Sequence, residues 1–220
     1  MSEPTGRALA RALGRGLYAV TPDETDTTRL LGLVEQVLTG QPALLQYRNK
    51  LAAPALRREQ AIAVHAACRR AGVPVVINDD LALALDIGAD GVHLGRDDGD
   101  PAAARRALGP GRILGVSCYN EWSRAVAGAQ AGVDYVAFGA MFVSPTKPQA
   151  GRASLDLIER ARRELALPVA AIGGITLDNA AQVVAAGADL VAVISDLFAA
   201  ADPAERAAAY RALWSASPSA

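Results

Sequence analysis

Residues 186–195, Ala-Gly-Ala-Asp-Leu-Val-Ala-Val-Ile-Ser, show the unit from which this chain is built. Gly187 marks the end of a helical stretch, because glycine is common just past a helix C-terminus, and an apolar strand begins soon after it. The strand shows no polar alternation, which is typical of a parallel strand covered on both faces. Similar helix-to-strand junctions occur at residues 71–73, 88–91 and 131–134.

Short apolar strands alternate with alanine-rich helical stretches from one end of the chain to the other. The spacing of the strands leaves room for one helix and two short loops in each unit. Eight such units in 220 residues predict a single-domain α/β fold, a (β/α)8 TIM barrel without long insertions. The expected strands are residues 16–20, 43–47, 75–77, 91–94, 113–117, 135–139, 169–172 and 190–194.

The ends of the chain differ from its centre. Residues 1–15 carry Arg7, Arg11 and Arg15 among alanine and leucine, and we interpret them as an N-terminal arm or short helix. Residues 16–214 contain no linker and are expected to form the barrel domain. Residues 215–220 are interpreted as a frayed tail.

The bulk composition limits the kinds of partner. The 22 basic and 23 acidic residues nearly cancel, which gives no support for binding nucleic acid or a membrane surface. No apolar run approaches the roughly 20 residues that span a bilayer. Cys68 and Cys118 lack the spacing of a disulfide framework or metal site, which suits reduced thiols in a cytoplasmic protein. We expect small-molecule substrates, and a homo-oligomer remains compatible with the sequence.

Acidic residues follow two neighbouring strands of the predicted barrel. Asn78-Asp79-Asp80 closes the third strand, and such a triplet is about as often a plain helix start with one capping residue. Asp98 lies in the loop after the fourth strand, where it can meet Asp79. Because Mg²⁺ commonly takes one or two carboxylates and completes its shell with water and phosphate, we predict Mg²⁺ at Asp79 and Asp98.

Cationic residues follow the second strand. Gln46, Arg48 and Lys50 are spaced by two, so their side chains can share one face. An exposed strand with alternating charge is the commoner source of such a triplet, but a buried barrel strand ends at this point. Arg48 and Lys50, together with Lys147, would offset the charge of a diphosphate.

The loops after the seventh and eighth strands are candidates for a phosphate site. Gly173-Gly174 follows the seventh strand, and Ile194-Ser195 follows the eighth. Glycine lets backbone N–H groups approach an anion, and in barrels of this kind these two loops often hold a phosphate.

Other polar residues are less specific. Ser117, Ser144 and Thr146 offer hydroxyl groups, although loop hydroxyls usually stabilise turns. His65 is expected to be structural. His93, in the fourth strand, is expected to be a packed or supporting residue rather than a base, because no nucleophile motif surrounds it.

Taken together, these motifs resemble the thiamine-phosphate synthase family over almost the whole chain. That resemblance implies a (β/α)8 barrel that joins 4-amino-2-methyl-5-(diphosphooxymethyl)pyrimidine to a thiazole phosphate, giving thiamine phosphate and pyrophosphate. Its most specific parts are Gln46-Tyr47-Arg48-Asn49-Lys50, Ile77-Asn78-Asp79-Asp80, Gly91-Val92-His93-Leu94-Gly95, Gly115-Val116-Ser117 and Ala171-Ile172-Gly173-Gly174-Ile175.

The resemblance also implies residue roles. Mg²⁺ would lie on Asp79 and Asp98. The catalytic residues would be Arg48, Lys50, Ser117 and Lys147. Contacts to the pyrimidine diphosphate would come from Gln46, Arg48, Lys50, Asn78, Ser117 and Lys147. Contacts to the thiazole phosphate would come from Ser144, Pro145, Thr146, Gly174, Ile194 and Ser195.

The chain departs from the family pattern at two positions. Pro145 stiffens the loop between the hydroxyls of Ser144 and Thr146. Arg96 stands where the family commonly has glutamine, and would contact phosphate or point to solvent. Two other functions remain open: a thiazole tautomerase of the same fold, which needs neither diphosphate nor metal, and a non-catalytic barrel that binds a phosphorylated ligand. The pairing of Asp79 with Asp98 beside the cations argues against both.

Overall fold

Eight parallel strands form a closed barrel in sequence order. The computed structural model describes residues 13–143 and 151–215. Each strand pairs in parallel with its neighbours in the chain, and β1 pairs with β8 to close the barrel. The strands are β1 (Gly16–Val20), β2 (Leu44–Tyr47), β3 (Val75–Asn78), β4 (Gly91–Leu94), β5 (Ile113–Tyr119), β6 (Tyr135–Phe138), β7 (Val169–Ile172) and β8 (Leu190–Val193). The predicted single-domain (β/α)8 barrel is confirmed.

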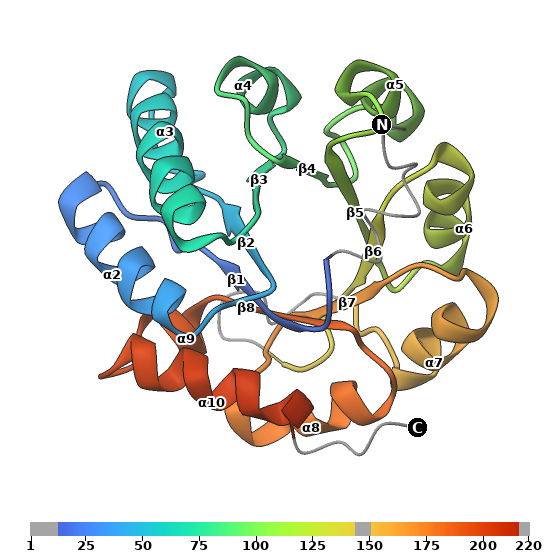
Figure 1. Ribbon diagram of the computed structural model, residues 1–220. Coiled ribbons are helices and arrows are strands. Elements are labelled where there is room, and N and C mark those ends of the chain that lie inside the picture. Colours follow the sequence, from blue (N-terminus) through green and yellow to red (C-terminus); the bar gives the residue numbers. More distant parts are fainter. Residues whose placement is uncertain (1–12, 144–150, 216–220) are drawn as a thin grey trace.

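Helices surround the strands, as Figure 1 shows. Two of them, α9 and α10, follow β8, and α10 packs beside α2 and α8. The helices are α2 (Thr27–Thr39), α3 (Pro54–Ala71), α4 (Leu81–Asp86), α5 (Pro101–Leu108), α6 (Trp122–Ala131), α7 (Leu155–Glu164), α8 (Leu177–Ala185), α9 (Ser195–Phe198) and α10 (Pro203–Ser215). Most of the predicted arm, residues 1–12, and most of the predicted tail, residues 216–220, lie outside the described residues.

The fifth strand extends two residues past its predicted end, and β3 extends one residue past its own. The expected strand at 113–117 continues to Tyr119, past an irregularity in register between Ser117 and Tyr119. Tyr119 has a positive φ of 56° and its hydroxyl accepts a hydrogen bond from the backbone N–H of Arg96 at 3.3 Å. The extension therefore links the end of β5 to the loop after β4.

The aspartates at the helix-to-strand junctions connect neighbouring strands at the amino-terminal end of the barrel. Asp90, Asp134 and Asp189 each precede a strand, and each side chain accepts the N–H of a residue at the start of the preceding strand. The N···O distances are 2.8 Å to Val75, 2.7 Å to Leu114 and 3.0 Å to Val169. Because an unpaired buried N–H is costly, these bonds explain the aspartate in the recurrent junction.

The apolar core has two parts. One lies between the strands and the helices, and the other fills the barrel interior around Tyr18 and Tyr135. Cys68 and Cys118 are free and buried, and burial raises the pKa of each thiol to about 12. Neither thiol is therefore reactive at neutral pH. Among the residues that the structure describes, no helix has the length and apolar character needed to cross a membrane.

Candidate active site

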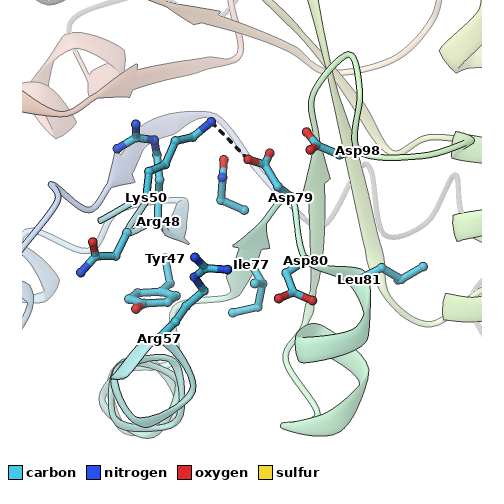
Figure 2. A pocket seen from close by; sticks show the side chains of 11 residues that line it. Tyr47, Arg48, Lys50, Arg57, Ile77, Asp79, Asp80, Leu81 and Asp98 are labelled. Carbon is cyan, nitrogen blue, oxygen red and sulfur yellow. Dashed lines mark ion pairs between the residues drawn. The ribbon is translucent and has the colours of Figure 1, made fainter. Parts of the chain in front are cut away.

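A cavity of about 450 Å³ opens at the carboxyl ends of β2, β3 and β4. Figure 2 shows side chains from the loops after these strands converging on it. Five predicted site residues line the cavity: Arg48, Lys50, Asn78, Asp79 and Asp98. Its other lining residues are Tyr47, Asn49, Arg57, Ile77, Asp80 and Leu81.

The Asn78-Asp79-Asp80 triplet both caps a helix and lines the cavity. The side chain of Asp80 accepts the N–H of Leu83 at 2.9 Å and caps α4. Asp80 thus caps the helix, and all three residues of the triplet line the cavity. Asp79 has a left-handed backbone with φ 64°, a conformation that few residues other than glycine adopt. Its N–H donates to the carbonyl oxygen of His93 at 2.8 Å, which ties this turn to β4.

The carboxylates of Asp79 and Asp98 face one point above Gly95. Asp98 Oδ2 accepts the N–H of Gly95 at 2.8 Å. A Cβ atom on residue 95 would lie 2.6 Å from Asp98 Oδ2 and 3.8 Å from Asp79 Oδ1, so only glycine leaves this space open. Burial raises the pKa of Asp98, and the adjacent Asp79 carboxylate raises it further. Two carboxylates this close repel each other when both are ionised.

This acidic pair fits a magnesium ion. Both ligands are hard oxygen donors, and a divalent cation between them would remove their repulsion. Within residues 13–143 and 151–215, no group of three or more His, Cys, Asp or Glu side chains is placed to hold a metal. Two carboxylates differ from the cysteine and histidine ligands of a closed zinc site, and they would suit Mg²⁺, which uses few protein ligands and fills its shell with water and phosphate.

Carboxylates hold both cations that follow β2. Lys50 Nζ lies 3.3 Å from Asp79 Oδ2, and Arg48 Nη1 lies 3.0 Å from Asp23 Oδ2. Asp23 Oδ1 also accepts the backbone N–H of Lys50 at 2.6 Å. Asp23 was not among the predicted site residues, although it follows the first strand as the other acidic residues follow theirs. It orients the loop that carries both cations.

Arg57 is a further cation that sequence reasoning missed. It lies on α3, points toward the cavity between Tyr47 and Asp80 in Figure 2, and donates to the carbonyl oxygen of Ala52 at 3.1 Å. A single arginine in a helix containing several arginines carries no pattern that would single it out.

Gln46 and Ser117 do not line this cavity: Gln46 is buried in β2, and Ser117 is half-buried in β5. A chain of buried side chains joins them. Gln46 Nε2 lies 2.5 Å from the Tyr18 hydroxyl, which lies 2.6 Å from the Tyr135 hydroxyl. The Tyr135 hydroxyl lies 2.8 Å from His93 Nδ1, and His93 Nε2 lies 2.8 Å from Ser117 Oγ.

His93 is a packed residue, as expected from the sequence. Its ring stacks on Tyr135 with centroids 5.6 Å apart. Burial lowers the pKa of His93 to about 4, so the imidazole is neutral near pH 7. A buried neutral imidazole with both nitrogens occupied is poorly placed to act as a base toward a substrate.

The predicted thiazole-phosphate residues are only partly described. Gly174 has φ 65°, and a Cβ atom there would lie 2.6 Å from the carbonyl oxygen of Phe142, so glycine is required where two loops cross. Ile194 and Ser195 follow β8, and Ser195 begins α9. These three residues lie at the same end of the barrel as the cavity but do not line it. Ser144, Pro145, Thr146 and the catalytic candidate Lys147 lie outside the described residues.

Arg96 is held against the end of β5. Its guanidinium forms an ion pair with Glu121 and lies 4.7 Å from the centre of the Tyr119 ring. Arg96 is exposed to solvent, one of its two expected positions, and contact with phosphate stays a prediction. Its pairing with Glu121 connects the loop that carries Asp98 to the start of α6.

Comparison with known proteins agrees with this architecture. A family model described as thiamine monophosphate synthase matches residues 17–197. A protein named thiamine-phosphate synthase from Aromatoleum aromaticum is 68% identical over 202 residues, covering 92% of this chain and 97% of that protein. A second, from Azoarcus sp. strain BH72, is 64% identical over 200 residues, with 91% and 97% covered.

The solved structures extend this relationship to three dimensions. Thiamine phosphate pyrophosphorylase from Pyrococcus furiosus superposes with a TM-score of 0.80 at 29% identity, covering 93% of this chain and 96% of the other. The family model spans all eight strands from β1 to β8. This chain therefore belongs to the thiamine monophosphate synthase family.

Proposed function

We propose that this barrel condenses 4-amino-2-methyl-5-(diphosphooxymethyl)pyrimidine with a thiazole phosphate, releasing pyrophosphate and forming thiamine phosphate. The observation that carries the proposal is the grouping of Arg48 and Lys50 with Asp79 and Asp98 around one cavity. Such a set of cations and carboxylates suits a diphosphate and its metal ion.

The cations would bind the diphosphate and stabilise its departure. Arg48 can grip phosphate oxygens through two N–H groups, and Lys50 supplies a compact positive charge. Lys147 is proposed to join them from the loop after β6. A bound Mg²⁺, held by Asp79 and Asp98, would neutralise charge on the leaving pyrophosphate. Asn78 would donate to the same group from the floor of the cavity.

The reaction would follow a dissociative route. The bond between the pyrimidine methylene and the diphosphate oxygen breaks, and the electron pair leaves with pyrophosphate. The thiazole nitrogen then donates its lone pair to the methylene carbon. Electrostatic stabilisation of the leaving group is the main catalytic task, because the chemistry needs no protein nucleophile. Holding both substrates in line and excluding water would be the other tasks.

The thiazole phosphate is proposed to bind between the loops that follow β6, β7 and β8. Gly174, Ile194 and Ser195 are the described candidates, and Ser144, Pro145 and Thr146 are the proposed partners from the loop after β6. Strand β8 pairs with β1, which pairs with β2, so the loop after β8 is two strands from the cations after β2, whereas Asp98 follows β4 on the opposite side of the barrel. We also propose a cytoplasmic location, which the free, buried thiols of Cys68 and Cys118 support.

One assay tests the proposal against its two alternatives. The purified protein is mixed with both substrates and Mg²⁺, and thiamine phosphate and pyrophosphate are measured. Formation of both products at equal rates is the expected result. Isomerisation of the thiazole without coupling would instead identify a tautomerase. Binding of phosphorylated ligands without turnover would identify a non-catalytic barrel.

A further inference from the structure

We infer that the buried chain Gln46–Tyr18–Tyr135–His93–Ser117 is a directional relay of hydrogen bonds, and that Tyr18, Tyr135 and His93 are positioning residues for the reaction. The relay makes the side-chain oxygen of Gln46 an acceptor and the hydroxyl of Ser117 a donor toward the substrates. The role in the reaction rests on the proposed function, whereas the direction of the chain does not.

The direction follows from the first bond. The structure places the amide nitrogen of Gln46, which is only a donor, next to the Tyr18 oxygen, and the inferred direction has that oxygen accepting from it. The Tyr18 hydrogen is then directed to Tyr135, whose oxygen lies 2.6 Å away. Tyr135 in turn donates its hydrogen to His93 Nδ1 at 2.8 Å.

The tautomer of His93 passes this direction to Ser117. Since Nδ1 accepts, the proton of the neutral ring is on Nε2, which donates to Ser117 Oγ at 2.8 Å. A doubly protonated ring would aim a second donor at the Tyr135 oxygen. The Tyr135 hydrogen would then have no acceptor within the part of the chain that the structure describes. Such an orphaned buried donor is costly, so the chain is consistent only with a neutral ring.

Because these groups are buried, the direction of the hydrogen bonds is maintained. The exposed fractions are 1% for Tyr18, 4% for Gln46, 6% for His93 and 0% for Tyr135. Water therefore cannot replace a partner lost by one of these four residues, and the bonds in such a chain strengthen one another. Gly115 leaves room for the Tyr135 ring, because a Cβ atom at position 115 would lie 2.0 Å from the ring carbon Cζ.

The two ends of the relay acquire opposite hydrogen-bonding character. Ser117 accepts from His93, so its own hydrogen is available to an anion, such as the proposed pyrophosphate. At the other end, no described residue donates to Gln46 Oε1, which leaves this oxygen to accept from the pyrimidine. If the hydrogen bonds ran in the opposite direction, Ser117 would donate its hydrogen to His93 and would present an oxygen lone pair to the phosphate.

Nuclear magnetic resonance of the histidine rings tests the direction without any substrate. The chain contains only His65 and His93, so protein labelled with ¹⁵N-histidine gives two ring systems. A His65→Gln variant, altered on the outer helix α3, assigns them. Long-range correlation of the ring nitrogens with the carbon-bound protons reports the tautomer. We expect the Nε2–H tautomer for His93 at neutral pH, and the Nδ1–H tautomer would overturn the inference.

A substitution at the far end tests transmission through the chain. Gln46→Glu replaces the donor with a carboxylate that only accepts, so Tyr18 would donate to it and each later bond would reverse. We expect His93 to switch to the Nδ1–H tautomer at mildly alkaline pH, where the glutamate is ionised. The double variant Gln46→Glu, Tyr18→Phe interrupts the chain and should restore the Nε2–H tautomer. An unchanged tautomer in the folded single variant would overturn the relay, and the wild-type measurement stays decisive if that variant does not fold.

Kinetics then test the positioning role. Tyr135→Phe removes the hydroxyl that joins Tyr18 to His93 while keeping the ring. We expect kcat to fall about tenfold, the worth of one hydrogen bond in the transition state, with KM for the thiazole phosphate unchanged. An unchanged kcat would overturn the positioning role. An Nε2–H tautomer in a wild-type protein that couples no substrates would count against the proposed function and leave the direction of the chain standing.

Discussion

Lys50 Nζ lies 3.3 Å from Asp79 Oδ2, so a proposed phosphate-binding cation contacts a proposed magnesium ligand. The side chains are 56% and 28% exposed, respectively. An ion pair this open to water contributes only about 0–1 kcal/mol to stability. The pair is therefore poorly explained as a support for the fold, and either residue can be changed to test function separately from folding.

Replacing Lys50 should impair turnover much more than stability. We expect Lys50→Ala to lower kcat by about 100-fold, the usual cost of losing one group that stabilises transition-state charge. Lys147→Ala should act in the same way. The matched control is Arg70→Ala, which removes an exposed ion pair with Glu35 outside the cavity and should leave kcat unchanged. Steady-state kinetics and thermal melts check both effects, and equal kcat values for Lys50→Ala and Arg70→Ala would remove Lys50 from the mechanism.

The acidic pair should determine the response to magnesium. Asp98→Asn and Asp79→Asn each remove one carboxylate from the space above Gly95, so we expect a higher Mg²⁺ concentration for half-maximal activity and a kcat lowered by at least about 100-fold. Asp97→Asn changes the exposed neighbour of Asp98 and serves as the control. Mg²⁺ titration of activity, with chelated enzyme as the baseline, measures the response. An Asp98→Asn enzyme with the response of Asp97→Asn would contradict the assignment of the metal site.

Gly115 should tolerate no side chain. Gly115→Ala would bring a methyl group to 2.0 Å from the Tyr135 ring, and we expect overpacking to lower the free energy of unfolding by about 1–3 kcal/mol. Gly111→Ala is the matched control, because in the described part of the chain no heavy atom lies within 4 Å of an added Cβ there. Urea unfolding compares the two variants. Similar stabilities would show that the barrel interior has room that the structure does not indicate.

Asp134 should contribute less to the free energy of unfolding as its carboxyl group ionises. Burial raises the pKa of Asp134 above its ordinary value of 3.8, although Leu114 and Arg105 donate to Oδ2. Its Oδ1 is buried and has no partner among the residues that the structure describes. The folded state thus binds this proton more tightly than the unfolded state. Stability contributed by Asp134 is present below its ordinary pKa and is lost as pH rises through the folded-state pKa.

Two substitutions at Asp134 test the direction of this dependence of stability on pH. Asp134→Asn keeps a neutral acceptor, so we expect a change within about 1 kcal/mol at low pH and a relative gain for the variant as pH rises above 3.8. Asp134→Ala leaves the Leu114 N–H without an acceptor and should cost about 1–3 kcal/mol at every pH. Urea unfolding across a pH series measures both. A wild type that gains stability over Asp134→Asn as pH rises would reverse the conclusion.

The polar residues that follow the strands could be predicted where the local sequence pattern marks the end of a strand. Asp79 and Asp98 each follow a buried apolar run, and parallel strands place such residues at one end of the barrel. Asp23 follows β1 as Asp79 and Asp98 follow their strands, so its position could have identified it, whereas Arg57 lies inside a helix and does not stand out by position. Arg96 pairs with Glu121, which follows the extension of β5 to Tyr119. The apolar pattern of the strand does not predict that extension.

The amino-acid sequence by itself determined the barrel, the order of its strands and the end at which polar residues collect, because these depend on apolar periodicity and on the glycines that end helices. Only the tertiary structure decided which of those polar residues meet. It placed Lys50 against Asp79, turned Arg96 toward Glu121, and drew Gln46 and Ser117 into a buried chain through Tyr18, Tyr135 and His93. Such contacts depend on ångström-scale distances between strands far apart in sequence, which residue spacing along one strand does not contain.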